Sequence, residues 1–146
     1  MNKISKFIQL SHSHKLIFLR GWLLLGYVRI LLLTLPFKYI AKLWLKPVSS
    51  VNFNYLTVDE SITQAQVIGK LIAAAAKYTP WYSKCLAQSI ACKIILRRFG
   101  IPNTIYIGVT KQDKKLTAHA WVTVHSHIIN GYNQTDYTVM THFSDE

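Results

Sequence analysis

An apolar stretch near the amino terminus, residues 15–45 (KLIFLRGWLLLGYVRILLLTLPFKYIAKLWL), constrains what this chain can fold into more than any other feature. Arg20 and Arg29 interrupt it, and a charged side chain at the centre of a bilayer is costly. Its longest uncharged runs, residues 21–28 and 30–37, fall far below the roughly 20 residues that a spanning helix needs. We therefore expect helices that pack on their own domain or on a partner protein. Peripheral attachment to a membrane surface is the next interpretation, and a transmembrane span the last.

Pro36 lies inside this stretch and predicts a break into two helices. A secretory signal would show a compact apolar run followed by a small-residue cleavage site, and the stretch lacks that pattern. The chain has two cysteines, Cys85 and Cys92, seven residues apart in one predicted helix. This spacing suggests no disulfide framework, so we expect a cytoplasmic protein that can associate with a membrane surface.

The length of 146 residues suits one ordinary domain, and 51% hydrophobic residues provide ample material for a core. Lysine and arginine number 17 against 6 acidic residues, a net charge of +11, which favours nucleic acid, an anionic membrane or an acidic peptide as partner. We predict that residues 1–50 form an apolar, basic helical extension and that residues 51–146 form the core domain. The segment 47–60, rich in Ser, Asn and β-branched residues, is expected to be an exposed connector.

Two further helices are predicted in the middle of the chain. Residues 57–79 (TVDESITQAQVIGKLIAAAAKYT) begin with an acidic turn and continue with apolar residues at helical spacing until Pro80 ends the helix. The next helix has Ser83 as its expected N-cap, and Gly100 stops it. Cys85 therefore falls in a first turn.

A first-turn position changes the chemistry of a thiol. Unpaired backbone N–H groups and the positive end of the helix dipole favour an anion there, which lowers the pKa of the thiol and enriches the nucleophilic thiolate. Cys92, two turns further on, lacks that help and is predicted to be a small buried hydrophobe. Cys85 alone is still consistent with a structural role, so a base has to be found.

Residues 103–111 (NTIYIGVTK) and 119–133 (HAWVTVHSHIINGYN) alternate in the way strands do, with a turn near His125 and Ser126. We predict that His119 opens a strand and that its face of the sheet looks toward the cysteine helix. A thiol on a helix and an imidazole on a strand suit thiol acyl transfer, because the imidazole holds the thiolate and later protonates the leaving amine.

The residue that fixes the tautomer of His119 should lie on the neighbouring strand. A turn at residues 125 and 126 would place Tyr132 directly opposite His119 and Asn130 diagonally, on the same face. Asn130 is the first choice, because an amide oxygen can accept the imidazole N–H. Asp136 is the alternative and would need a bulge or a longer hairpin.

Two runs resemble a known family. PWYSKCLAQSIACKIILRRFGIPNTIYIGV (residues 80–109) followed by AHAWVTVHSHIINGY (residues 118–132) resembles the leader peptidases of lasso peptide biosynthesis, a branch of the transglutaminase-like superfamily. The residues that carry the resemblance are Pro80, Trp81, Cys85, Leu86, Gln88, LRRFGIP (residues 96–102), the YIGV strand and His119-Ala120-Trp121-Val122.

The resemblance implies an α+β fold of the transglutaminase-like and papain-like type, in which the Cys-bearing helix packs on an antiparallel sheet that bears the His, with an N-terminal helical extension. It also implies a cysteine peptidase that removes the leader from a ribosomally synthesised lasso peptide precursor. The family's catalytic Cys and His carry over to Cys85 and His119. The family's carboxylate does not, because IINGYN stands where it is expected. Two further residues are expected at the substrate-binding site: Trp121 would wall the groove or be a packed core residue, and Gln88 would support the site.

Partners follow from the same resemblance. The chain begins almost at once with the apolar stretch, so it resembles the split form, in which a separate winged-helix-like recognition protein captures the leader. We expect the precursor's leader region, that recognition protein and the lasso cyclase as partners. The apolar helices and the basic surface would dock the recognition protein and attract acidic leader residues.

Other classes of function remain open at this stage. A transglutaminase-like acyl transferase would use the same Cys85 and His119 but pass the acyl group to an amine. A non-enzymatic basic module binding a membrane surface or nucleic acid would tolerate Cys85→Ala, but the aromatic and glycine patterns of nucleic-acid readers are absent, so no nucleic acid is expected. Neither a cofactor nor a metal is expected, because paired histidines such as His125 and His127 lack further ligands.

Overall fold

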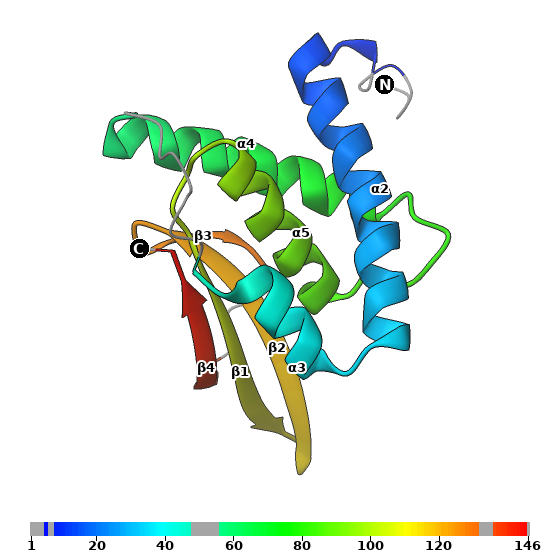
Figure 1. The fold of residues 1–146 in the computed structure, drawn as a ribbon, viewed down its shortest axis with the longest axis vertical. Coiled ribbons are helices and arrows are strands. Elements are labelled where there is room, and N and C mark those ends of the chain that lie inside the picture. Colours follow the sequence, from blue (N-terminus) through cyan, green and yellow to red (C-terminus); the bar gives the residue numbers. More distant parts are fainter. Residues whose placement is uncertain (1–4, 6–7, 48–55, 132–135, 146) are drawn as a thin grey trace.

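The computed structural model describes residues 5, 8–47, 56–131 and 136–145. A four-stranded antiparallel sheet has the strand order β3-β2-β1-β4. Helices α4 and α5 pack against it, and α2 packs on these two helices (Figure 1). The elements are α2 (His12–Thr34), α3 (Phe37–Ile40), the π-helix η1 (Ala41–Leu45), α4 (Val58–Ala76), α5 (Cys85–Arg98), β1 (Thr104–Gln112), β2 (Lys115–Val124), β3 (His127–Asn130) and β4 (Thr138–Ser144).

Helix α2 belongs to the same hydrophobic core as the rest of the molecule. Its side chains Leu25 and Val28 are buried together with residues of α4, α5 and the sheet. At Gly21 a Cβ would lie 2.6 Å from Cδ1 of Ile72, so the glycine allows α2 and α4 to approach closely. The prediction that the apolar helix packs on its own domain is confirmed for this face. The predicted domain boundary at residues 50 and 51 lies outside the described residues and stays a prediction.

The helix ends follow local sequence signals. Helix α2 ends two residues before Pro36, which caps α3, so the predicted break is confirmed. Helix α4 begins with a capping box between Thr57 and Glu60, in which each residue satisfies a backbone N–H of the other. Helix α5 ends just before Gly100, whose φ of 67° is readily adopted only by glycine.

Two tight hairpins build most of the sheet. The β2–β3 turn falls at His125 and Ser126, both with positive φ, as predicted. The β1–β2 turn falls at residues 113 and 114, so β2 begins at Lys115. The prediction that His119 opens the strand is therefore wrong, because the strand starts four residues earlier. Strand β4, which pairs with β1, was not predicted.

The face of the sheet that packs on the helices is that of Val122 and Val124. Both are fully buried in the core shared with α4 and α5, whereas the ring of Trp121 lies against Tyr106 and Tyr137. Successive side chains of a strand point to opposite faces, so His119 shares the face of Trp121. The prediction that this face looks toward the cysteine helix is wrong, because the smaller β-branched residues fill the space under α5.

A buried charged cluster ties β4 to α5. Lys93 is 0% exposed, and its Nζ lies 2.9 Å from Oδ2 of Asp145 and 3.2 Å from the carbonyl oxygen of Asn103. Arg97 Nη2 lies 2.6 Å from the other oxygen of Asp145 and Arg97 also donates to the carbonyl of Trp44 in η1. Lys93, Arg97, Asn103 and Asp145 are called the Asp145 cluster below.

Candidate active site

Cys85 is the first residue of α5, as predicted, and its thiol is free and half-buried. The N-cap is Lys84, which makes no side-chain capping bond, so the prediction of Ser83 as N-cap is wrong. The Ser83 hydroxyl instead pairs with Oγ1 of Thr79 at 2.9 Å. The backbone N–H groups of the first turn therefore carry no side-chain cap, and they surround the position of the thiol.

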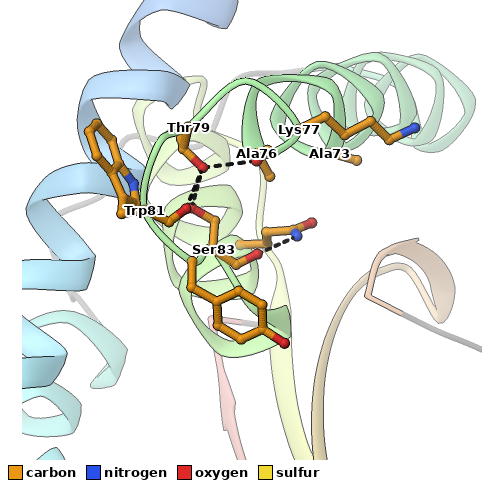
Figure 2. Close-up of a pocket in the computed structure, with 8 residues that line it drawn as sticks. Ala73, Ala76, Lys77, Thr79, Trp81 and Ser83 are labelled. Carbon is orange, nitrogen blue, oxygen red and sulfur yellow. Dashed lines mark hydrogen bonds between the residues drawn. The ribbon is translucent and has the colours of Figure 1, made fainter.

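The loop before Cys85 is held by a small set of hydrogen bonds. The Thr79 hydroxyl lies 2.9 Å from the carbonyl oxygens of Ala76 and Trp81 and bridges toward Ser83 (Figure 2). Gln88 Nε2 donates to the carbonyl of Ser83 at 2.9 Å, across the first turn of α5. Gln88 thus fixes the approach of the chain to Cys85, and its predicted place in the substrate-binding site stays a prediction.

A hollow of about 450 Å³ opens beside this loop. Its lining residues come from the end of α4, the loop and α5, and they are Ala73, Ala76, Lys77, Thr79, Trp81, Tyr82, Ser83 and Gln88. The hollow reaches Ser83, two residues before the thiol, and the small Ala73 and Ala76 leave it open. It is a candidate substrate-binding cleft.

Trp81 fastens the same loop to α2. Its ring lies 4.9 Å from that of Trp22, centroid to centroid, and points toward α2 in Figure 2. Gly26 leaves room for it, because a Cβ there would come within 2.8 Å of the indole. Trp22 Nε1 also donates to the carbonyl of Tyr78 at 3.2 Å. Helix α2 therefore helps to position Cys85.

His119 lies in the middle of β2, opposite Gly108 of β1. The Tyr137 ring is stacked on the imidazole, with centroids 5.1 Å apart and planes inclined by 16°. Nε2 is buried and has no hydrogen-bond partner among the described residues. Burial lowers the pKa of His119 below its ordinary value of 6.5, since desolvation disfavours the cation.

At His119, the described residues pair with β2 on one side only. The β2–β3 pairing runs from Val124 to Val122, where Asn130 is the last partner among the described residues. At His119 the strand is thus paired with β1 alone within that part of the chain. The described hydrogen bonds do not join His119 to Cys85, so the structure brings the two residues to neighbouring elements, α5 and β2, without a bond between them.

Asn130 lies on the other face of the sheet. It is opposite Val122, and its Nδ2 donates to the carbonyl of Gly69 in α4 at 3.2 Å, while its Oδ1 is buried without a partner among the described residues. The described structure therefore joins Asn130 to α4 and not to His119. Asp136 is exposed and directly precedes Tyr137. The identity of the third catalytic residue stays a prediction, and Tyr132 lies outside the described residues.

Trp121 is buried and packed against aromatic side chains. It is 8% exposed, and its ring is stacked on Tyr106 at 5.5 Å and also contacts Tyr137. These contacts place it in an aromatic row beside His119. Its predicted contact with substrate stays a prediction.

The second cysteine is inert. Cys92 is fully buried, and burial raises the pKa of its thiol to about 12. This confirms its prediction as a small buried hydrophobe. Among the described residues, no group of three His, Cys, Asp or Glu is placed to hold a metal ion.

The comparisons with known proteins add a family. No curated protein and no solved structure matches the chain. Residues 31–142 match the transglutaminase-like superfamily, and this range contains α3 to β3 and most of β4. The predicted α+β fold, with a Cys-bearing helix on an antiparallel sheet and a helix before them, is confirmed. The match covers well over half of the chain, and the protein therefore belongs to the transglutaminase-like superfamily.

Proposed function

We propose that the protein is a cysteine peptidase that removes the leader from a lasso peptide precursor. The observation that carries the proposal is the presence of two reactive side chains, Cys85 and His119, to which the described contacts give no structural role. Cys85 is a free, half-buried thiol at a helix start, and His119 has a buried Nε2 without a partner among the described residues. A buried polar atom left unpaired is costly, and catalytic groups are one of the known reasons for it. The superfamily includes cysteine peptidases and acyl transferases, which both need this pair.

The proposed mechanism is acyl transfer through a thioester. His119 takes the proton of the Cys85 thiol, and the resulting thiolate attacks the carbonyl carbon at the leader–core junction, so that the tetrahedral intermediate places its oxyanion at the backbone N–H of Cys85. His119 gives its proton to the amine of the departing core peptide, which leaves the leader bound to sulfur. His119 then takes a proton from water, which hydrolyses the thioester and frees the leader.

The environment of His119 suits the second half of this cycle. Burial favours the neutral imidazole, which can accept a proton from water at neutral pH. The stacking of Tyr137 on the ring brings the segment that contains Asp136 to the histidine, whereas Asn130 bonds to α4. These contacts favour Asp136 over Asn130 as the residue that orients His119. The mechanism requires a rearrangement that brings Cys85 and His119 together, because in the described structure His119 lies on the face of β2 that points away from α5.

The proposed working arrangement is the split one, in the cytoplasm. A separate leader-recognition protein presents the leader, and the cyclase takes up the released core. The net charge of +11 supports the approach of an acidic leader segment.

The test is mass spectrometry of a precursor peptide encoded beside this protein, incubated with and without the small recognition protein. Wild type plus partner should cut at the leader–core junction. Cys85→Ala should be inactive, and the matched variant Cys92→Ala should remain active. Cleavage by Cys85→Ala would refute the mechanism. A leader joined to an added amine, in place of free leader acid, would identify an acyl transferase instead.

A further inference from the structure

Helix α2 carries an apolar stripe that nothing in the described structure covers. One side of the helix is buried against α4 and α5, and the opposite side is exposed. The exposed apolar residues are Leu16, Leu19, Leu23, Tyr27, Ile30 and Leu33, called the α2 stripe below. Their spacings of three or four residues place them on one side of the helix, within an arc of about 120°. Leu23 is 57% and Leu33 67% exposed. Contact of this much apolar surface with water is unfavourable, and such patches mark interaction sites.

The stripe is bordered by positive charge. The first 58 residues contain eight lysines and arginines and no acidic residue. Helical spacing places Arg20 along one edge of the stripe, and Lys15 and Arg29 along the other. Among the described residues none of these three forms an ion pair. An apolar band between two rows of basic side chains complements an anionic lipid surface, where the band enters the acyl boundary and the cations meet headgroups.

A second observation favours lipid over a protein partner. A hollow of about 350 Å³ lies between α2, η1 and α5 and shares Leu23 and Tyr27 with the stripe. Its lining is mainly aliphatic and aromatic, and it includes the two basic residues Arg20 and Arg98. An apolar hollow with two cations suits an acyl chain whose phosphate headgroup lies above it.

The packing of α2 decides its orientation. The helix is long and apolar enough to cross a membrane by length and composition, a criterion that core helices and signal sequences also meet. However, Leu25 and Val28 are buried in the core, and Trp22 is bonded to Tyr78. A helix packed on a folded domain cannot be surrounded by lipid, so α2 could contact a membrane only when it lies parallel to the membrane surface.

We propose that the α2 stripe binds the surface of an anionic bilayer, with α2 parallel to the membrane and the rest of the domain in solution. The loop that carries Cys85 is fastened to the same helix through Trp22 and Trp81. Membrane binding would therefore hold the candidate active site at a fixed distance from the lipid surface.

The experiment is co-sedimentation of the full chain with vesicles of phosphatidylcholine, with and without phosphatidylglycerol. Wild type should bind the anionic vesicles, and added salt should weaken the binding. A triple variant of the α2 stripe should reduce vesicle binding about tenfold or more, because the stripe is then too polar to enter the acyl boundary. Its substitutions are Leu19→Gln, Leu23→Gln and Ile30→Gln. The matched control changes Leu116, Ile128 and Met140 to Gln, which are exposed apolar residues of the sheet, and should bind as wild type does.

Charge is tested separately. The double variant Arg20→Glu and Arg29→Glu should reduce vesicle binding about tenfold or more. The control is the double variant Lys111→Glu and Lys115→Glu, which makes the same change of net charge in the β1–β2 hairpin and should reduce vesicle binding less. Thermal melting by circular dichroism verifies that each variant is folded.

Three outcomes overturn the proposal: wild type that ignores anionic vesicles, stripe variants that bind as well as wild type, or equal losses in both charge variants. Stripe variants that keep vesicle binding but lose capture of the leader-recognition protein would assign the surface to that protein. Cys85→Ala should bind vesicles as wild type does, so failure of the proposed peptidase activity and failure of membrane binding are distinguishable.

Discussion

Replacing Asp145 by asparagine tests how much the buried negative charge of the Asp145 cluster contributes to stability. The carboxylate is 2% exposed and accepts from Lys93, Arg97 and Asn103. Asparagine keeps the size of the side chain but removes the negative charge. Arg97 reaches the cluster from a partly exposed position and retains the carbonyl of Trp44, so the loss falls mainly on Lys93.

The expected cost follows from the burial of Lys93. Its ammonium group, 0% exposed, would lose the charge of Asp145 and would keep the neutral carbonyl of Asn103 as an acceptor. Removing one partner of a buried ion pair costs about 3–5 kcal/mol, against about 5–15 kcal/mol for the whole stability of a typical domain. Combining Asp145→Asn with Lys93→Met should destabilise less than Asp145→Asn alone, since the buried cation is then removed together with its counter-charge.

Urea unfolding followed by tryptophan fluorescence measures these differences, since the chain has four tryptophans. The matched control is Asp59→Asn, which removes an exposed carboxylate from the first turn of α4 and should cost about 0.3–1 kcal/mol. If Asp145→Asn costs no more than this control, or if Lys93→Met makes it worse, the assigned role of the ion pair is refuted.

Two further predictions concern the candidate site. Iodoacetamide at neutral pH should label Cys85 and leave Cys92 unlabelled in the folded chain, because burial raises the pKa of the Cys92 thiol to about 12. Peptide mass spectrometry identifies the labelled cysteine, and labelling of Cys92 would contradict its buried position. Burial lowers the pKa of His119 in the folded chain below its value of 6.5 in the unfolded chain. At pH values between these two pKa values the unfolded chain binds more protons, so the free energy of unfolding should rise with pH. Tyr137→Ala should expose the ring and raise its pKa toward 6.5, measured by NMR titration of the imidazole Cε1 proton, with Tyr106→Ala as control.

Local signals in the sequence were sufficient for the main helices, for the turn between β2 and β3 and for the position of the thiol. Pro80 and the apolar periodicity that follows it place Cys85 at a helix start, and the sequence at His125 and Ser126 marks the hairpin. Which face of β2 would be covered could not be predicted, because both faces carry bulky residues, Trp121 on one and Val122 on the other. Only the packing of the helices decides between them.

The parts that were missed depend on contacts between distant segments. Strand β4 has mostly exposed side chains and no regular apolar alternation, so its pairing with β1 is invisible locally. Lys93, a charged residue between apolar neighbours of α5, was the one available signal for the Asp145 cluster, since a lysine in that position requires a buried acceptor. Its partner lies 52 residues away.

The strand order has a consequence for when the candidate site is completed during synthesis. Strand β4 is synthesised after the other described strands, yet it closes the sheet beside β1, and Tyr137, which stacks on His119, immediately precedes it. While the ribosome still holds this segment, the histidine lacks its aromatic cover and Lys93 lacks its counter-charge. The surroundings of His119 and of Lys93 are therefore completed only when β4 and the residues beside it have joined the sheet.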